Sequence, residues 1–257
     1  MIKTEGIVLR ENKYKESSKI LSVYTRKNGK VSVMARGANR PKSRLLANTQ
    51  VFSYNEYQFR RGRNFYYINQ ADIIDSFYAI RENMERLVYG FFLLELVEKS
   101  VPMEEANEKI FFLLLKTLKT LAVKKKDFLK LILAFELKYI SFLGYRPFIE
   151  SCVICGRGQA REFRFSNFEG GIICDNCYTK DLRAKALDRK TYELLVRLMY
   201  MPLDRLEEIE ASDVLLNKLQ NIIESYILYN IDRRGFNSLD FFKINKFNLA
   251  RTDIDKE

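Results

Sequence analysis

The chain has 257 residues, of which 47% are apolar and 13% aromatic, enough for one large or several small folded domains. Charges interrupt residues 1–19, and no uncharged apolar run reaches the roughly 18 residues that a membrane-spanning helix needs. We therefore expect neither a secretory signal nor a membrane span, and we predict a cytoplasmic protein.

The formal net charge of +11 is concentrated in the first quarter of the chain. Residues 1–70 carry 15 lysines and arginines against 4 acids, whereas residues 71–257 carry 29 of each. No acid lies between Glu16 and Glu56. A segment of one charge sign indicates a polyanionic partner, and a basic surface that is merely solvated is the alternative. A membrane surface usually binds a basic amphipathic helix, and this segment does not have a helical pattern.

Residues 1–78 alternate with period two and are broken by turn residues, a pattern typical of β-strands. We expect strands over 6–10, 51–59 and 65–73, and a hairpin over 20–35 in which Asn28 and Gly29 form a type I′ turn. Five short strands predict a small closed barrel, such as an OB-fold. Its aromatic residues can stack on bases where they face outward. They are Phe52, Tyr54, Tyr57, Phe59, Phe65, Tyr66 and Tyr67.

Beyond the barrel, the apolar residues recur with the period of helices. Helical stretches are expected over 84–100, 104–122, 124–145, 188–200 and 212–230, the third being apolar on almost every side and hence central. We predict one helical domain from residues 79–149 and 181–240, interrupted by an inserted segment at 150–180. Residues 241–257 are predicted to form a flexible tail.

The inserted segment holds all four cysteines as two Cys-x2-Cys pairs, Cys152 with Cys155 and Cys174 with Cys177. Two such pairs supply four thiolates to one tetrahedral metal, and the nearby glycines allow the tight turns that this requires. We predict one structural Zn²⁺ in a zinc ribbon. Disulfides are disfavoured in a cytoplasmic protein. Catalysis is disfavoured because four thiolates close the metal shell and the chain has no histidine to activate a cysteine.

Several motifs resemble the bacterial recombination mediator family RecO. In the middle of the chain these are FELKYISFLGYRP, SCVICG and FEGGIICDNC; near the start they are GIVLR, YKESSKILSVYT and GANRPKSRLLANTQVF. The resemblance covers about residues 5–230. One position departs from it, since Asn39 stands where we would expect another basic residue. The resemblance implies an α+β multidomain fold: an N-terminal five-stranded OB-fold barrel, then a mostly α-helical domain with an inserted four-cysteine zinc ribbon.

The family resemblance also implies a function in DNA repair by homologous recombination. Members bind single- and double-stranded DNA, anneal complementary strands, bind the acidic tail of single-stranded DNA-binding protein, and load RecA together with RecR. It therefore implies a non-catalytic, nucleoid-associated bacterial protein. For the acidic tail, the cations at 124–126 are a candidate site of low specificity.

The DNA-binding surface is predicted to use cations of the basic segment and of the neighbouring turn, whose contacts with phosphates are indifferent to base sequence. These are Lys27, Lys30, Arg36, Arg40, Lys42, Arg44, Arg60, Arg61 and Arg63. Two alternatives are an RNA-binding zinc-ribbon adaptor and a metal-dependent nuclease. The nuclease is disfavoured because the dense acidic run at 204–213 is typical of a solvated helix surface.

Overall fold

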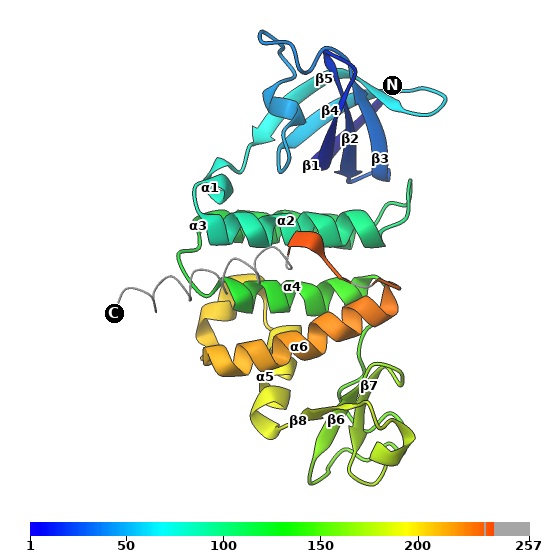
Figure 1. Cartoon of the computed structure of the whole chain (residues 1–257), viewed down its shortest axis with the longest axis vertical. Coiled ribbons are helices and arrows are strands. Elements are labelled where there is room, and N and C mark those ends of the chain that lie inside the picture. The colour runs from blue at the N-terminus through cyan, green and yellow to red at the C-terminus, as the bar shows by residue number, and fades with distance from the viewer. Residues whose placement is uncertain (234, 239–257) are drawn as a thin grey trace, which may run out of the picture. The chain divides into compact units, whose positions relative to one another are not determined.

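The computed structural model describes residues 1–233 and 235–238, and its N-terminal part is a closed five-stranded barrel (Figure 1). The strands are β1 (Ile2–Tyr14), β2 (Ser18–Thr25), β3 (Gly29–Ala35), β4 (Tyr54–Arg61) and β5 (Tyr66–Asp75). They follow the order β1-β2-β3-β5-β4, and β1 pairs with β4 to close the barrel. All pairs are antiparallel except β3 with β5. This confirms the predicted barrel, whose strand order is that of an OB-fold.

The interior of the barrel is filled by inward-facing side chains, which alternate with less buried ones along the first part of β2 and of β3. Val31 and Val33 of β3 point inward, and the rings of Tyr57 and Phe59 stack with their centroids 4.8 Å apart. Of the seven aromatic residues considered above, only Phe65 and Tyr67 are half-buried, and the other five are buried. Most of these rings therefore serve the core, and the expected outward-facing aromatics reduce to two.

The hairpin between β2 and β3 differs from the predicted type I′ turn. Gly29 has φ +65°, but Asn28 is not among the residues with positive φ. Thr25 pairs with Gly29, so the loop has three residues and not two. The hydroxyl of Thr25 accepts the N–H of Asn28 at 3.1 Å and donates to the Gly29 carbonyl at 2.8 Å, which supports this longer loop. The left-handed residue is Gly29, which directly follows the three loop residues and begins β3, where its missing side chain permits the positive φ.

Three helices follow the barrel: α1 (Tyr78–Arg81), α2 (Met84–Ser100) and α3 (Glu108–Val123). Asn83 and Asn107 cap α2 and α3, because their side-chain oxygens accept the N–H groups of Arg86 and Ile110. The α2 helix packs against β1 (Figure 1). Residues Met1–Lys124, together with residues 236–238, belong to one compact unit.

The second compact unit covers Lys125–Gly235. It contains α4 (Phe128–Phe142), α5 (Arg189–Tyr200), a short 3-10 helix η3 (Leu203–Glu208) and α6 (Asp213–Asn230). The α4 helix is buried along most of its length and contacts α5, α6 and η3, which confirms its predicted central place. Between α4 and α5 lies a three-stranded sheet in the order β7-β6-β8. Its strands are β6 (Phe163–Ser166), β7 (Gly171–Cys174) and β8 (Lys185–Leu187).

The helices that the sequence analysis assigned to one domain fall into two different compact units. Helices α1–α3 group with the barrel, and α4–α6 group with the cysteine segment. The single helical domain over 79–149 and 181–240 stays a prediction. The inserted sheet reaches Leu187, beyond the predicted limit at residue 180, because β8 pairs with β6. The predicted tail at 241–257 lies outside the described residues. Within the described ranges, no helix is both long and apolar enough to cross a membrane.

Candidate nucleic-acid interface and metal centre

The segment between β3 and β4, residues 36–53, is here called the basic loop. Its cations Arg36, Arg40, Lys42 and Arg44 are all exposed. The loop turns tightly, since the N–H of Ser43 donates to the Arg40 carbonyl at 2.9 Å. Ala38 is fully buried in the barrel core. The loop is therefore held at a point between its first two cations.

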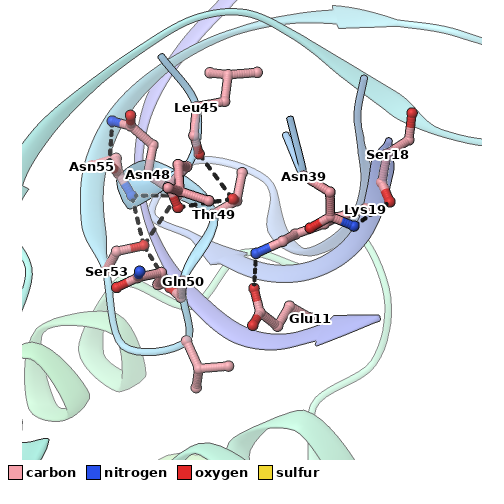
Figure 2. Close-up of polar contacts among 12 residues, drawn as sticks. Glu11, Ser18, Lys19, Asn39, Leu45, Asn48, Thr49, Gln50, Ser53 and Asn55 are labelled. Atoms are coloured by element: carbon pink, nitrogen blue, oxygen red, sulfur yellow. Dashed lines mark hydrogen bonds and ion pairs between the residues drawn. The ribbon is translucent and has the colours of Figure 1, made fainter. Parts of the chain in front are cut away.

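Asn39, which stands where we expected another basic residue, anchors this loop. Its side-chain amide donates to the Ser18 carbonyl at 3.2 Å, and its backbone N–H donates to the Ser17 carbonyl at 2.9 Å (Figure 2). Next to it, Lys19 is buried and its ammonium lies 2.6 Å from a carboxylate oxygen of Glu11. Asn39 thus ties the loop to the start of β2.

The far end of the basic loop is fixed by a buried polar network. Asn48 donates to the Asn55 side-chain oxygen at 2.9 Å and to the Ala71 carbonyl at 3.1 Å. Asn55 in turn donates to the Asn48 carbonyl and to the Tyr57 hydroxyl, at 3.2 and 2.9 Å (Figure 2 shows the two asparagines together). Burial raises the pKa of Tyr57, so its hydroxyl keeps its proton. Both ends of the loop are therefore attached to the barrel.

The turn between β4 and β5 lies beside the start of the basic loop. The guanidinium carbons of Arg36 and Arg60 lie 4.8 and 5.2 Å from the ring centroid of Tyr67. Gly62 allows the close approach in this turn, because an added Cβ would lie 2.5 Å from the Tyr67 ring and 3.0 Å from the Phe65 carbonyl oxygen. Arg63 is exposed at the tip. The structure thus brings Arg36 and Arg60 together around one half-buried ring.

Three of the predicted DNA-binding residues lie in different surroundings. The guanidinium of Arg61 is 2.8 Å from a carboxylate oxygen of Glu104. Lys30 donates from its ammonium to the Glu98 carbonyl on α2, and Lys27 is exposed in the hairpin loop. These lysines flank the start of β3, whereas the basic loop follows its end, about 20 Å away for a seven-residue strand.

Two further cations at the loop end of the barrel were missed in the sequence analysis. Lys13 and Lys15 are exposed and lie where β1 meets β2, since Tyr14 pairs with Ser18. Ser17 and Ser18 hold Asn39, so this corner adjoins the basic loop. The pairing register of β1 with β2 could have placed these lysines beside the loop. They were left out because only the acid-free segment after Glu16 was considered.

The candidate metal centre is formed by the four cysteines. Cys152 and Cys174 are buried, and the four Sγ atoms lie within 4.8 Å of one another. Each pair is shaped by a tight turn: the N–H of Gly156 donates to the Cys152 carbonyl at 2.8 Å, and that of Cys177 to the Cys174 carbonyl at 2.9 Å. Gly156 has φ +73°, which favours glycine there.

The donor set fits a tetrahedral thiolate site. With metal–sulfur bonds of about 2.3 Å, two ligands of one tetrahedron lie roughly 3.8 Å apart. The Sγ atoms of Cys155 and Cys174 are 3.7 Å apart. Burial opposes ionisation of Cys152, but the backbone N–H groups of Cys155, Cys174 and Ile154 and the Cys155 thiol together lower the Cys152 pKa to about 6. The chain can therefore hold a metal ion at this point.

The cations at 124–126 lie at the end of α3. The carbonyl of Lys124 accepts from the guanidinium of Arg86, at 2.7 and 3.0 Å, while Lys125 and Lys126 are exposed. As a site for an acidic peptide they stay a prediction.

The fold and these sites define an OB-fold protein with attached helices and an inserted four-cysteine module. Profiles of two families match nearly the whole chain: "Recombination protein O N terminal" over residues 1–77 and "Recombination protein O C terminal" over residues 81–240. The chain belongs to the RecO family, and its role lies in DNA repair and recombination.

Curated relatives agree with this assignment. The chain is 37% identical to "DNA repair protein RecO" of Alkaliphilus metalliredigens, over 95% of this chain and 99% of that protein. It is 30% identical to the protein of the same name from Acetivibrio thermocellus, over 94% and 96%. The protein of that name from Bacillus pumilus is 32% identical, over 95% and 96%. The resemblance seen in the sequence motifs is thereby confirmed.

Proposed function

We propose that this chain is a non-catalytic recombination mediator that binds single- and double-stranded DNA through its barrel. The observation that carries the proposal is the set of exposed cations on the basic loop, attached at both ends and joined to the next turn through Tyr67. The proposed contacts centre on Arg36, Arg40, Lys42, Arg44, Arg60 and Arg63. Lys27, Lys30 and Arg61 are secondary, since Lys30 and Arg61 already bind other groups of the protein.

Strand annealing follows from the same chemistry. Two DNA strands repel each other through their phosphates, and a cationic surface that holds them lowers this barrier while their bases remain free to pair. Mixing labelled complementary oligonucleotides with the protein tests this directly. We expect pairing to be accelerated at low salt and the acceleration to disappear at high salt. Pairing at the uncatalysed rate under both conditions would contradict the proposal.

The proposed partners are RecR, RecA and the acidic tail of single-stranded DNA-binding protein. An apolar groove of about 620 Å³ lies between β1 and α2, but its rim includes Glu11, Glu95 and Glu98 against Arg10 and Lys99. This balance of charge does not favour an acidic peptide. We therefore keep the cations at 124–126 as the candidate and propose a titration of the tail peptide against a Lys125→Ala, Lys126→Ala variant.

The metal is proposed to be one structural Zn²⁺, since zinc combines a preference for thiolates with tetrahedral geometry. Cys152, Cys155, Cys174 and Cys177 would hold it. The zinc would supply folding free energy to the ribbon and no reaction step. The proposal includes a cytoplasmic, nucleoid-associated location.

Two assays separate the proposal from its alternatives. Incubation of labelled DNA with Mg²⁺ would reveal cleavage by a nuclease, and we expect none. Competition between DNA and RNA strands of the same sequence would reveal an RNA-binding adaptor, for which RNA would displace DNA at equal or lower concentration.

A further inference from the structure

We propose that the ribbon carries a second surface for single-stranded DNA, centred on an arginine whose side chain leaves the face of the sheet opposite the helices. The surface, called the ribbon patch, consists of Arg161, Arg164, Phe168, Tyr178, Lys180 and Arg183. The inference deepens the proposed function and rests on it, because annealing requires that two strands be held at once.

The alternation along β6 defines the two faces of the sheet. Phe163 and Phe165 point to the helices: their rings lie 5.8 Å from that of Tyr192 on α5 and 5.2 Å from that of Tyr226 on α6. Arg164 lies between them in sequence, so its side chain leaves the opposite face of the strand. On that face its register partners are the fully buried Ile173 of β7 and the exposed Ala186 of β8.

On this outer face, Arg164 stacks on an exposed tyrosine. Its guanidinium carbon is 4.9 Å from the ring centroid of Tyr178, and Tyr178 is 41% exposed. The Ser166 hydroxyl donates to the Asp181 carboxylate at 2.6 Å, which ties the turn that carries Tyr178 to β6. A ring held by a cation and open to solvent is a platform on which bases of a single strand stack.

The same module carries three further exposed cations. Arg161, Lys180 and Arg183 are exposed, and none of them forms an ion pair within residues 1–233 and 235–238. Phe168, in the turn that follows β6, is 71% exposed and is a second aromatic ring of the module that is open to solvent. Phosphates of a strand whose bases stack on the rings would meet these cations.

A cavity of about 860 Å³ is lined by Arg161 and Arg164 and, on the side of the helices, by Tyr192 of α5 and Lys218 of α6. Two acids of its lining are already engaged: Asp188 binds Lys218 and caps α5, and Glu193 lies 2.9 Å from Arg189. Glu162 is the remaining acid there, against the two arginines of the patch. Among the described residues, the unpaired charges that line the cavity therefore favour binding of an anion.

A second arginine–tyrosine pair in the same unit provides a matched control. The guanidinium of Arg146 lies 5.4 Å from the ring centroid of Tyr200, which is 53% exposed. Here, however, Glu150 accepts from both, at 3.0 Å from Arg146 and 2.7 Å from Tyr200. The carboxylate neutralises the cation, so this pair should not bind a phosphate strand.

The sequence contains no tryptophan, which allows a clean fluorescence test. In a Tyr178→Trp variant of the full chain, with bound metal measured to show that the ribbon is folded, addition of oligo-dT should quench the single tryptophan. A Tyr200→Trp variant should show no quenching. Quenching in the Tyr178→Trp variant should persist when Arg36, Arg40 and Arg44 are all replaced by alanine. Replacing Arg161 and Arg164 in this variant should raise the oligo-dT concentration needed for quenching about tenfold. This loss of affinity is comparable to the loss of one stacked base.

The result that overturns the ribbon patch is an unquenched Tyr178→Trp variant that still binds a labelled strand. Equal quenching of the Tyr178→Trp and Tyr200→Trp variants would also overturn it. So would loss of the Tyr178→Trp response when the three arginines of the basic loop are replaced. Failure of the unaltered protein to bind any labelled strand would instead refute the proposed function itself, so the two failures are distinct.

Discussion

The guanidinium carbon of Arg36 lies 4.8 Å from the ring centroid of Tyr67, so the first cation of the basic loop rests on a ring of β5. Arg60 approaches the same ring at 5.2 Å. The basic loop and the end of β4, which are separate in the sequence, thus contact the same ring. The positions of the Arg36 and Arg60 charges depend on this ring.

Replacing this ring should weaken DNA binding without removing any charge. We expect Tyr67→Ala to lower the affinity for a single strand about tenfold, since the cation–π contacts that position Arg36 and Arg60 are worth about 0.5–2 kcal/mol each. Tyr67→Phe, which keeps the ring, should bind nearly as tightly as the unaltered chain. Fluorescence anisotropy at fixed salt measures both, and equal affinities for the alanine and phenylalanine variants would contradict the role of the ring.

The buried asparagines should contribute to stability as well as to the shape of the loop. Asn55→Ala leaves the Asn48 carbonyl and the Tyr57 hydroxyl with fewer partners in the barrel interior. We expect a loss of about 2–4 kcal/mol in the free energy of unfolding, measured with urea. Asn64→Ala, at an exposed position, should cost less than about 0.5 kcal/mol. Similar midpoints for the two variants would show that the network is not stabilising.

Removal of the metal should unfold the ribbon and leave DNA binding by the barrel intact. Chelation should expose four reactive thiols and unfold β6–β8, because a structural zinc contributes on the order of 10 kcal/mol to small modules. Phosphate binding by the basic loop should survive, since the loop belongs to the unit Met1–Lys124. Thiol titration and DNA binding, measured before and after chelation, check this. Purified protein with metal far below one equivalent and fully reactive thiols would refute the site.

Glu136 should make the protein less stable as the pH rises. It is buried in α4, and burial together with the charge of Glu224 raises its pKa well above the usual value. The native state therefore keeps a proton that the unfolded chain releases above about pH 4.5, so the stability present below that pH is lost as pH rises towards the folded pKa. Glu136→Gln should remove this loss, with a larger gain in unfolding free energy at pH 8 than at pH 5. An equal change at both pH values would contradict it.

The sequence allowed the elements of this fold to be predicted because their patterns are local. Alternation marked the strands of the barrel, and the predicted helix at 84–100 has the bounds of α2, which begins after a capping asparagine. The cysteine spacing located the candidate metal centre for the same reason, since each pair lies within one turn.

What the sequence did not reveal depends on contacts between distant segments. Lys30 belongs to the same basic segment as Arg36, yet it binds a carbonyl of α2 and lies at the other end of β3. Tyr57 and Tyr67 look alike in the pattern, but only the closure of the barrel buries the first and leaves the second beside two arginines. The grouping of α1–α3 with the barrel likewise requires the packing, which periodicity does not encode.

The central claim is that the basic loop binds DNA phosphates, and the salt dependence of single-strand binding tests it most directly. Six to eight contacts predict a slope of log K against log salt of roughly −4 to −6, at about −0.7 per contact. Replacing Arg36, Arg40 and Arg44 by alanine should flatten the slope by about two units. A control variant that loses three helix lysines, Lys116, Lys119 and Lys190, should keep the original slope. An unchanged slope in the loop variant, or an equal flattening in the control, would place the DNA-binding surface elsewhere.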